Sequence, residues 1–334
     1  MLSLSTSIYV TMLFVEHRNS AWRKLKMKVE EIITDRIVRM LEAGTVPWHK
    51  PWANHENGSD GFPRNAITKR HYRGINVFIL ASQSHGSPYW LTYKEAIRLG
   101  GHVRQGEHGT PIVFWKWLSK EVEKADGEVK EQHFPMLRHY TVFNAEQTEG
   151  CRLPADAKPE DGPNFNPIEA CEAVYANMPK RPRLEHGATM AITRGHRFEA
   201  YYTAGTDMVV MPRREAFDSP EFYYSVLFHE LTHSSGAIHR LNRATLNQAV
   251  KFGDTNYSKE ELVAEMGAAF LAGHTGIEQV TLNNNAAYLS SWIKALKGDA
   301  RLVIQAGAAA QKAVDYILNR QAETAQDAGC ALAA

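Results

Sequence analysis

The stretch FHELTHSSGAIHRLNR, residues 228–243, constrains the fold most, because it contains the pattern HExxH. On an α-helix, residues four apart lie on one face, so His229 and His233 can reach the same ion. Glu230 then lies beside the open coordination position, where it can take a proton from water. Two imidazoles with one carboxylate suit zinc and leave a fourth position for that water. The pattern therefore predicts a helix here, one zinc ion per chain, and Glu230 as general base.

The residues on either side of this motif carry the signals of a helix that begins and ends close to it. Ser219 is a good N-cap, and Pro220 suits the first helical position. Glu221 favours the positive end of the helix dipole, and Gly236 can end the helix. Both histidines then fall on one helix. This favours a metal site over the competing interpretation, a pair of hydrogen-bonded histidines in the core.

Two segments compete to supply the third ligand. Gly236 and His239 complete the longer pattern HExxHxxGxxH, which is typical of metzincins. That pattern needs a methionine turn further along the chain. The nearest methionine, Met266, lies instead in an alanine-rich stretch that predicts a helix. We therefore interpret His239 as an exposed residue just past the helix end.

The second segment is YSKEELVAEMGAAFL, residues 257–271. Glu261 and Glu265 lie one helical turn apart and share a face, so one can bind zinc while the other orients a ligand histidine. This resembles the gluzincin arrangement, in which ExxxD follows HExxH on a later helix, with Glu replacing Asp here. If Ser258 and Glu261 instead form a capping box, Glu265 is the ligand. We prefer Glu261 and keep Glu265 as the alternative.

Composition is that of an ordinary globular protein. The 334 residues can hold two domains, and the net charge of +1 excludes a polycation. The three cysteines form no CxxC pair, which favours the reducing cytoplasm. Residues 8–15 are apolar but too short to span a membrane, and basic residues follow rather than precede them. Because Met27 opens a more regular helical pattern, residues 1–28 are expected to be an extension from an upstream start codon.

Periodicity and turn residues predict an α+β chain with a linker near its middle. A helix is expected over residues 29–42, and strands over 111–118 and 139–145, with a charged, solvated hairpin over 119–133. Residues 150–166, rich in Pro, Asp and Gly, form the clearest linker. The remaining expected elements are a helix starting at Pro167, strands over 188–193 and 200–211, and helices over 286–297 and 299–318, the last capped by Asp299.

Positive charge is concentrated in the first half of the chain. Residues 36–116 contain 11 Lys and Arg against 5 Asp and Glu, a surplus of 11 − 5 = +6, so the remainder carries −5. A basic groove with aromatic platforms suits single-stranded nucleic acid, because cations neutralise phosphates while rings stack on unpaired bases. The alternative is that the tryptophans fill the core and the cations are ordinary surface. The candidate DNA-binding residues are Trp48, Lys50, Trp52, Arg64, Lys69, Arg70, Tyr72, Arg73, Arg104 and Lys116.

Six segments follow one another in a specific order: TDRIVRMLEAGTVPWHKPW, YRGINVFILA, YWLTYKEAIRLGGHVRQGEHGTPIVFWK, YTVFNAEQ, FHELTHSSGAIHRLNR and YSKEELVAEMGAAFL. In that order they resemble the ArdC-type antirestriction proteins of conjugative plasmids, from about Val29 to Leu318. The resemblance implies a single-stranded-DNA-binding domain over 29–149 and a zincin-like metallopeptidase domain over 167–322, followed by a flexible tail over 323–334. Related N-terminal domains occur in plasmid primases.

The resemblance also implies roles for individual residues. It places the metal on His229 and His233, with Glu230 as base, and it favours a glutamate of EELVAE over His239. The implied function is to protect incoming plasmid DNA from restriction, with single-stranded DNA and an unidentified protein as partners. Two alternatives stay open: a DNA-binding shield whose peptidase fold is not catalytic, and a DNA-associated protease that repairs protein crosslinks.

Overall fold

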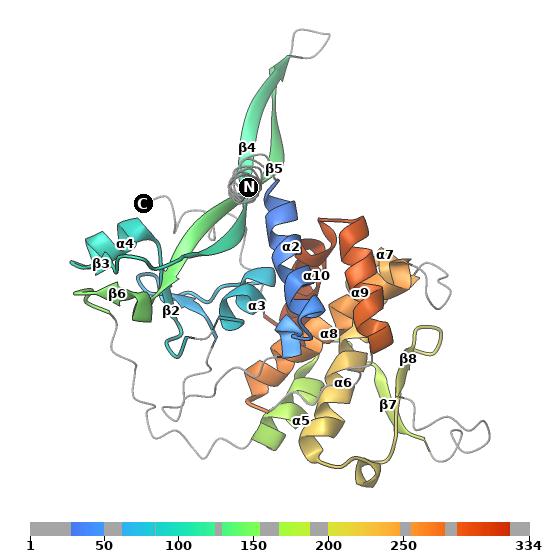
Figure 1. The fold of residues 1–334 in the computed structure, drawn as a ribbon. Coiled ribbons are helices and arrows are strands. Elements are labelled where there is room, and N and C mark those ends of the chain that lie inside the picture. Colours follow the sequence, from blue (N-terminus) through green and yellow to red (C-terminus); the bar gives the residue numbers. More distant parts are fainter. Residues whose placement is uncertain are drawn as a thin grey trace, which may run out of the picture.

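The chain folds into a body of mixed helices and sheets from which one long two-stranded ribbon projects (Figure 1). The computed structural model describes residues 28–49, 62–83, 85–123, 129–153, 167–187, 200–247, 255–277 and 286–320. None of the helices in these ranges is long and apolar enough to cross a membrane.

The first half contributes short helices around a four-stranded sheet. Its elements are α2 (Val29–Glu42), η1 (Pro47–His49), β1 (Arg64–Asn65), α3 (Ile75–Ala81), β2 (Tyr89–Leu91), α4 (Tyr93–Arg98), β3 (His102–Val103), β4 (Thr110–Glu123), β5 (Val129–Asn144), η2 (Ala145–Gln147) and β6 (Thr148–Glu149). The sheet has the strand order β1-β2-β5-β4, and β3 pairs with β6 in a separate two-stranded sheet.

The second half is mainly helical, with one small sheet. Its elements are α5 (Pro167–Asn177), β7 (Arg183–His186), β8 (Tyr201–Thr203), β9 (Met208–Met211), η4 (Arg214–Ala216), α6 (Pro220–Ser235), α7 (Ala244–Asn247), α8 (Thr255–Thr275), α9 (Ala286–Gly298) and α10 (Leu302–Ile317). In the sheet, β9 lies between β7, to which it runs parallel, and β8, to which it runs antiparallel.

Helices with clear end signals match their predictions closely. The predicted helix over 29–42 is α2, which buries Ile33, Ile37 and Leu41 along one face. The helix predicted from Pro167 is α5, and the one over 286–297 is α9. The predicted helix over 299–318 begins later than expected, at Leu302. Asp299 does not cap it, since its carboxylate accepts instead from the Arg301 N–H, in the turn before the helix.

The charged hairpin predicted over 119–133 is present, but its strands are longer than the predicted strands over 111–118 and 139–145. β4 and β5 continue through most of it in unbroken antiparallel register, with Glu123 paired to Val129, and form the projecting ribbon (Figure 1). Backbone pairing can extend a hairpin beyond the apolar alternation that reveals a strand in a sequence, so these strand ends were not predicted. Of the predicted strands further on, 200–211 is the β8–β9 hairpin. The strand over 188–193 and the linker residues 154–166 lie outside the described residues.

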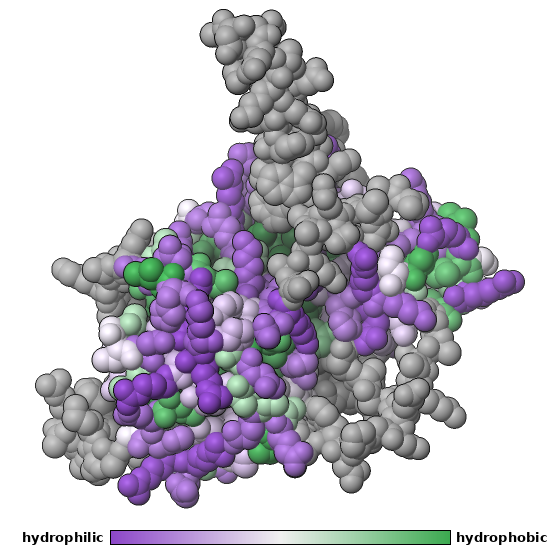
Figure 2. All heavy atoms as spheres, turned by 180° about the vertical axis from the view of Figure 1, so that it is seen from behind, coloured by the Kyte–Doolittle hydropathy of each residue, from purple (hydrophilic) through white to green (hydrophobic). Residues whose placement is uncertain are grey.

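One hydrophobic core runs through both halves of the chain. Trp48 packs edge to face against Phe78 and against Trp292 of α9, with ring centroids 6.4 and 5.5 Å apart. Phe78 also stacks on Phe270 of α8, with centroids 4.6 Å apart. Seen from behind, the surface is mainly hydrophilic with smaller apolar areas between (Figure 2). The domain limits predicted from the sequence stay a prediction, because one continuous core contains residues from both predicted domains.

Two contacts between α3 and α10 join the halves through backbone and charge. A Cβ added to Gly307 of α10 would lie 2.7 Å from the backbone nitrogen of Ile75, so the two helices meet at van der Waals distance of their main chains. Just before α3, the Arg73 guanidinium forms an ion pair with Asp315 of α10. The two halves of the chain are thus held together by complementary shape as well as by charge.

We expect Gly307→Ala to lower the free energy of unfolding by about 1–3 kcal/mol, because the added methyl group overlaps backbone that cannot rotate away. Urea denaturation followed by circular dichroism measures the change. Gly298→Ala is the matched control, since a Cβ at that helical glycine meets nothing within 4 Å. Equal stability of the two variants would contradict the close approach of α3 and α10.

Candidate metal centre

Helix α6 presents the two histidines as its end signals predicted. The Ser219 hydroxyl accepts from the Phe222 N–H at 3.2 Å, Pro220 is the first helical residue, and Gly236 follows the last turn. His229 and His233 lie one turn apart, and His229 is 7% exposed. The helix is buried on nearly every side, so both imidazoles face protein rather than bulk water. The prediction of one helix carrying both histidines is confirmed.

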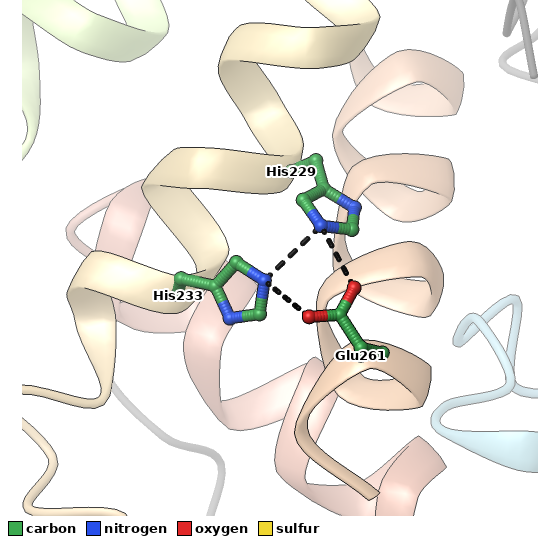
Figure 3. A group of neighbouring side chains, drawn as sticks. All are labelled: His229, His233 and Glu261. Atoms are coloured by element: carbon green, nitrogen blue, oxygen red, sulfur yellow. Dashed lines mark hydrogen bonds and ion pairs between the residues drawn. The ribbon is translucent and has the colours of Figure 1, made fainter. Parts of the chain in front are cut away.

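Helix α8 passes beside α6 and brings a carboxylate to the same point (Figure 3). A close approach permits this, because a Cβ added to Gly267 of α8 would lie 2.5 Å from the Thr232 side chain of α6. The Nε2 atoms of His229 and His233 are 3.1 Å apart. The Glu261 carboxylate oxygens lie 3.5 Å from the first Nε2 and 3.6 Å from the second.

These distances fit a single tetrahedral ion. Ligand atoms about 2.0–2.1 Å from zinc at tetrahedral angles lie about 3.3–3.4 Å from one another. The two Nε2 atoms are 3.1 Å apart, and each lies near a different Glu261 oxygen, Oε2 at 3.5 Å for His229 and Oε1 at 3.6 Å for His233, so all of these separations are close to that value. Two imidazoles and one carboxylate also leave a fourth position for water or substrate, as hydrolytic metal sites do. The residues present therefore fit a divalent metal ion.

The centre is electrostatically prepared for positive charge. Burial lowers the pKa of His229, but hydrogen bonding to Glu261 and the charges of Glu265 and Glu230 outweigh burial and raise it to about 9. The pKa of His233 is raised too: burial opposes the shift, while the Glu260 hydrogen bond and the Glu261 charge drive it. Several carboxylates thus favour a cation at this point.

The geometry separates the two candidate carboxylates. Glu261 faces the Nε2 atoms shared by both rings, whereas Glu265 Oε1 lies 3.6 Å from Nδ1 of His229, on the outer side of that ring. Glu265 is therefore placed to orient His229 rather than to bind the ion. The capping-box alternative is wrong, because Ser258 lies inside α8 and its hydroxyl pairs with that of Ser291.

The residues of the metzincin pattern serve other purposes. His239 is exposed, as predicted, and its Nε2 lies 3.2 Å from Asp207 Oδ2. Met266 is fully buried within α8, so it does not form a methionine turn. Gly236 adopts φ −79°, an ordinary helical value, so its backbone conformation does not require glycine.

Glu230 lies buried next to the ligands, 7% exposed, and its charge contributes to the raised pKa of both histidines. Within the described part of the chain, its carboxylate accepts no hydrogen bond. A water molecule entering the centre can therefore use it as acceptor. The structure places Glu230 where the motif predicted it, beside both imidazoles.

Sequence reasoning missed one carboxylate at the centre, that of Glu260. Glu260 Oε1 lies 3.3 Å from Nδ1 of His233 and also accepts from Arg243, and Thr245 donates its hydroxyl to Oε2. Burial raises the pKa of Glu260, but hydrogen bonds from His233 and Arg243 outweigh it and lower the pKa to about 2. No sequence signal distinguished Glu260, because it immediately precedes the expected ligand and should point elsewhere.

The predicted nucleic-acid residues divide into two groups, and the two aromatic members of the first are corrected. Trp48 and Tyr72 are 1% and 7% exposed, so neither ring is available to stack on a base. Both lie in the core instead, as the alternative interpretation held. Arg73 is paired with Asp315, and the Arg64 guanidinium lies over the Tyr89 ring, 5.9 Å from its centroid.

The second group stays on the surface. Lys69 and Arg70 are exposed in the turn after β1, which Asn65 tightens by accepting from the Ile67 and Thr68 N–H groups. Arg104 is exposed and hydrogen-bonded to Glu107. Three predicted residues cannot be placed in this way: Lys50 and Trp52 lie outside the described residues, and Lys116 lies on β4 with its side chain outside them.

Each half of the chain matches the model of a known protein family. A family model for the N-terminal domain of the anti-restriction factor ArdC matches residues 27–143. A second model, for a zincin-like metallopeptidase, matches residues 183–310. The second match contains the histidines of α6 and the glutamates of α8.

Individual relatives give the same picture. The DNA primase TraC of Escherichia coli is 35% identical over 309 residues, which are 88% of this chain but only 27% of the primase. The chain thus spans about a quarter of that curated relative. The metal-free crystal structure of the antirestriction protein ArdC from plasmid R388 is 34% identical, with a TM-score of 0.67, and 89% of this chain covers all of it. Its Mn(II)-bound structure is 33% identical with a TM-score of 0.67, covering 88% of this chain and 98% of that one.

We expect the two carboxylates of α8 to differ in their effect on metal binding. Glu261→Ala should abolish stoichiometric binding, because it removes a ligand. Glu265→Gln should lower affinity about 10- to 100-fold, because it removes only an orienting contact. Competition with a chromophoric chelator measures both constants. A larger loss in Glu265→Gln than in Glu261→Ala would reverse the assignment.

Proposed function

Because the chain belongs to the ArdC family of antirestriction proteins, we propose that it joins a metal-dependent peptidase centre to a surface that binds single-stranded DNA, and so protects incoming plasmid DNA. The observation that carries the proposal is the convergence of His229, His233 and Glu261 beside Glu230. Four side chains of these types, buried together, suit hydrolysis better than they suit a structural core.

The chemistry divides between the ion and the chain. A bound divalent ion would act as a Lewis acid toward a peptide carbonyl and would make water a stronger acid. Glu230 accepts the proton from the attacking water and passes it to the departing amine. Glu265 and Glu260 hold the rings of His229 and His233 in orientation from their Nδ1 sides. Zinc suits this donor set best, with one ion per chain.

Substrate binding fits the sheet next to α6. Among the described strands, β8 forms an edge of the β7-β9-β8 sheet. An extended peptide can add to such an edge through main-chain hydrogen bonds. The unidentified protein partner would then bind as a strand alongside β8, whichever residues it carries.

DNA binding is assigned to the surface group of cations. Lys69, Arg70 and Arg104 are exposed in the half that matches the ArdC N-terminal model. They can neutralise phosphates without reading sequence. Trp48 and Tyr72 are buried, so Trp52 is the remaining aromatic candidate for stacking on bases.

A non-catalytic shield is the second candidate. Helix α8 also forms the core on which α3 rests, through Phe270 and Phe78, and α6 packs against α8, so both helices would persist without catalysis. In that case the metal centre would stabilise the fold while DNA binding alone blocks restriction. A repair protease would share the centre but act on protein–DNA crosslinks.

We expect Glu230→Gln to retain metal and to lose peptide hydrolysis by a factor of about 10²–10⁴, since it removes the general base and no ligand. Cleavage of an unstructured fluorogenic peptide and of a protein–DNA adduct, alongside metal content, tests this. Antirestriction in cells is measured in parallel. Full antirestriction in the variant would favour the shield, and cleavage confined to adducts would favour repair.

Removing surface cations should weaken DNA binding in a salt-dependent way. For Lys69→Ala/Arg70→Ala, we expect lower affinity for an oligothymidylate. The slope of log affinity against log salt should be shallower by about 0.7 per lost phosphate contact. Fluorescence anisotropy across a salt series measures it, with exposed Lys312→Ala on α10 as the control. Salt-insensitive binding, or a preference for duplex, would count against this surface.

A further inference from the structure

Arg243 lies at the end of the loop that leaves α6 and is almost fully buried, with its side chain 10% exposed. The loop folds back on the helix, because the Arg243 N–H donates to the Gly236 carbonyl at 2.9 Å and that of Leu241 to Ser235. This reversal carries the guanidinium to the last turn of the helix that holds both histidines.

The guanidinium bonds on two sides. Toward α6, its Nη2 donates to the Thr232 carbonyl at 2.6 Å and to that of His233 at 3.3 Å, and its Nη1 donates to the Ser235 hydroxyl at 2.7 Å. Toward α8, its Nε and Nη2 donate to the two oxygens of Glu260 at 3.2 and 2.6 Å. One planar group thus ties the end of α6 to the carboxylate that faces His233.

Glu260 connects this group to the metal centre. Its Oε1 accepts from Arg243 and lies 3.3 Å from Nδ1 of His233, while its Oε2 accepts from Arg243 and Thr245. An imidazole that donates from Nδ1 presents the Nε2 lone pair on the other side of the ring. Nε2 is the atom that faces His229 and Glu261.

Gly236 supplies an independent observation. A Cβ at this position would lie 2.8 Å from the Cζ and Nη2 atoms of Arg243. The guanidinium cannot shift to make room without breaking its bonds to both helices. Since φ at Gly236 does not require glycine, the absence of a side chain there serves to admit the guanidinium over the backbone.

We propose that Arg243 is a positioning residue for metal binding, which acts through Glu260 to fix the ring of His233, and that Gly236 makes room for it. The inference rests on the metal centre proposed above. Lysine could not replace the arginine. The planar guanidinium reaches acceptors on both helices at once, whereas a single ammonium group cannot.

Arg240 provides a matched control from the same loop. Its side chain is fully buried, it bonds both oxygens of Asp207 at 2.8 Å, and it also donates to the Ser234 carbonyl. It therefore shares with Arg243 its burial, its carboxylate partner and its contact with the end of α6. The difference lies in the carboxylate: Asp207, the partner of Arg240, contacts none of the proposed metal ligands, whereas Glu260, the partner of Arg243, contacts His233.

The test measures Co²⁺ affinity by chelator competition, and the visible absorption of the Co²⁺-saturated protein, for the unsubstituted chain, Arg243→Lys, Gly236→Ala and Arg240→Lys. We expect Arg243→Lys and Gly236→Ala to lose about 10- to 100-fold in affinity, as for other groups that orient metal ligands, and to change the absorption bands. Arg240→Lys should stay within about twofold with unchanged bands, although it melts at a lower temperature.

Each other outcome has a definite meaning. Affinity within twofold of the unsubstituted protein in a folded Arg243→Lys or Gly236→Ala would overturn the inference. An equal loss in Arg240→Lys would overturn it too, because general destabilisation would then explain the effect. If neither Arg243→Lys nor Gly236→Ala folds, the residue is structural and the inference fails. Absence of Co²⁺ binding in the unsubstituted chain would instead refute the metal centre itself.

Discussion

The close approach of α6 and α8 is the constraint on which the rest of the structure depends. Gly267 allows it, since any side chain there would meet Thr232. At that separation a glutamate on one helix reaches two imidazoles on the other, and three carboxylates of α8 line a single helical turn of α6. Helix α8 of this pair also contacts η1, and its Phe270 stacks on Phe78 of α3. A slightly wider spacing would cost both the ligand geometry and the packing of the first half.

Local signals predicted the parts of the centre that lie within a few residues of each other. Ser219, Pro220 and the HExxH spacing all act along one helix, so sequence alone placed His229 and His233 correctly on it. Glu260 escaped notice for a physical reason. Successive helical residues are rotated by about 100°, so a neighbour of Glu261 should face away from the ligand. Its carboxylate nevertheless faces His233, and Arg243 from the loop after α6 donates to both of its oxygens.

The aromatic residues of the first half show where composition fails as a guide. A tryptophan in a basic segment satisfies the description of a stacking platform and of a core residue equally well. The choice depends on partners from the other half of the chain, and for Trp48 these include Trp292. The ribbon is a different case, because its pairing partner is local but its sequence gives no apolar alternation that would mark the full length of the strands. The exposure of cations such as Lys69 was easier to predict than that of the tryptophans, because burial of an unpaired charge is costly.

The continuous core limits how the two halves can be separated by recombination. Phe78 and Phe270 are 0% and 3% exposed, and each ring covers part of the other. A recombination event that moved one half alone would leave a large apolar face open to water in both products. The match to the TraC primase includes both halves within a much longer protein. The two halves are therefore expected to be kept together, because each covers apolar surface of the other.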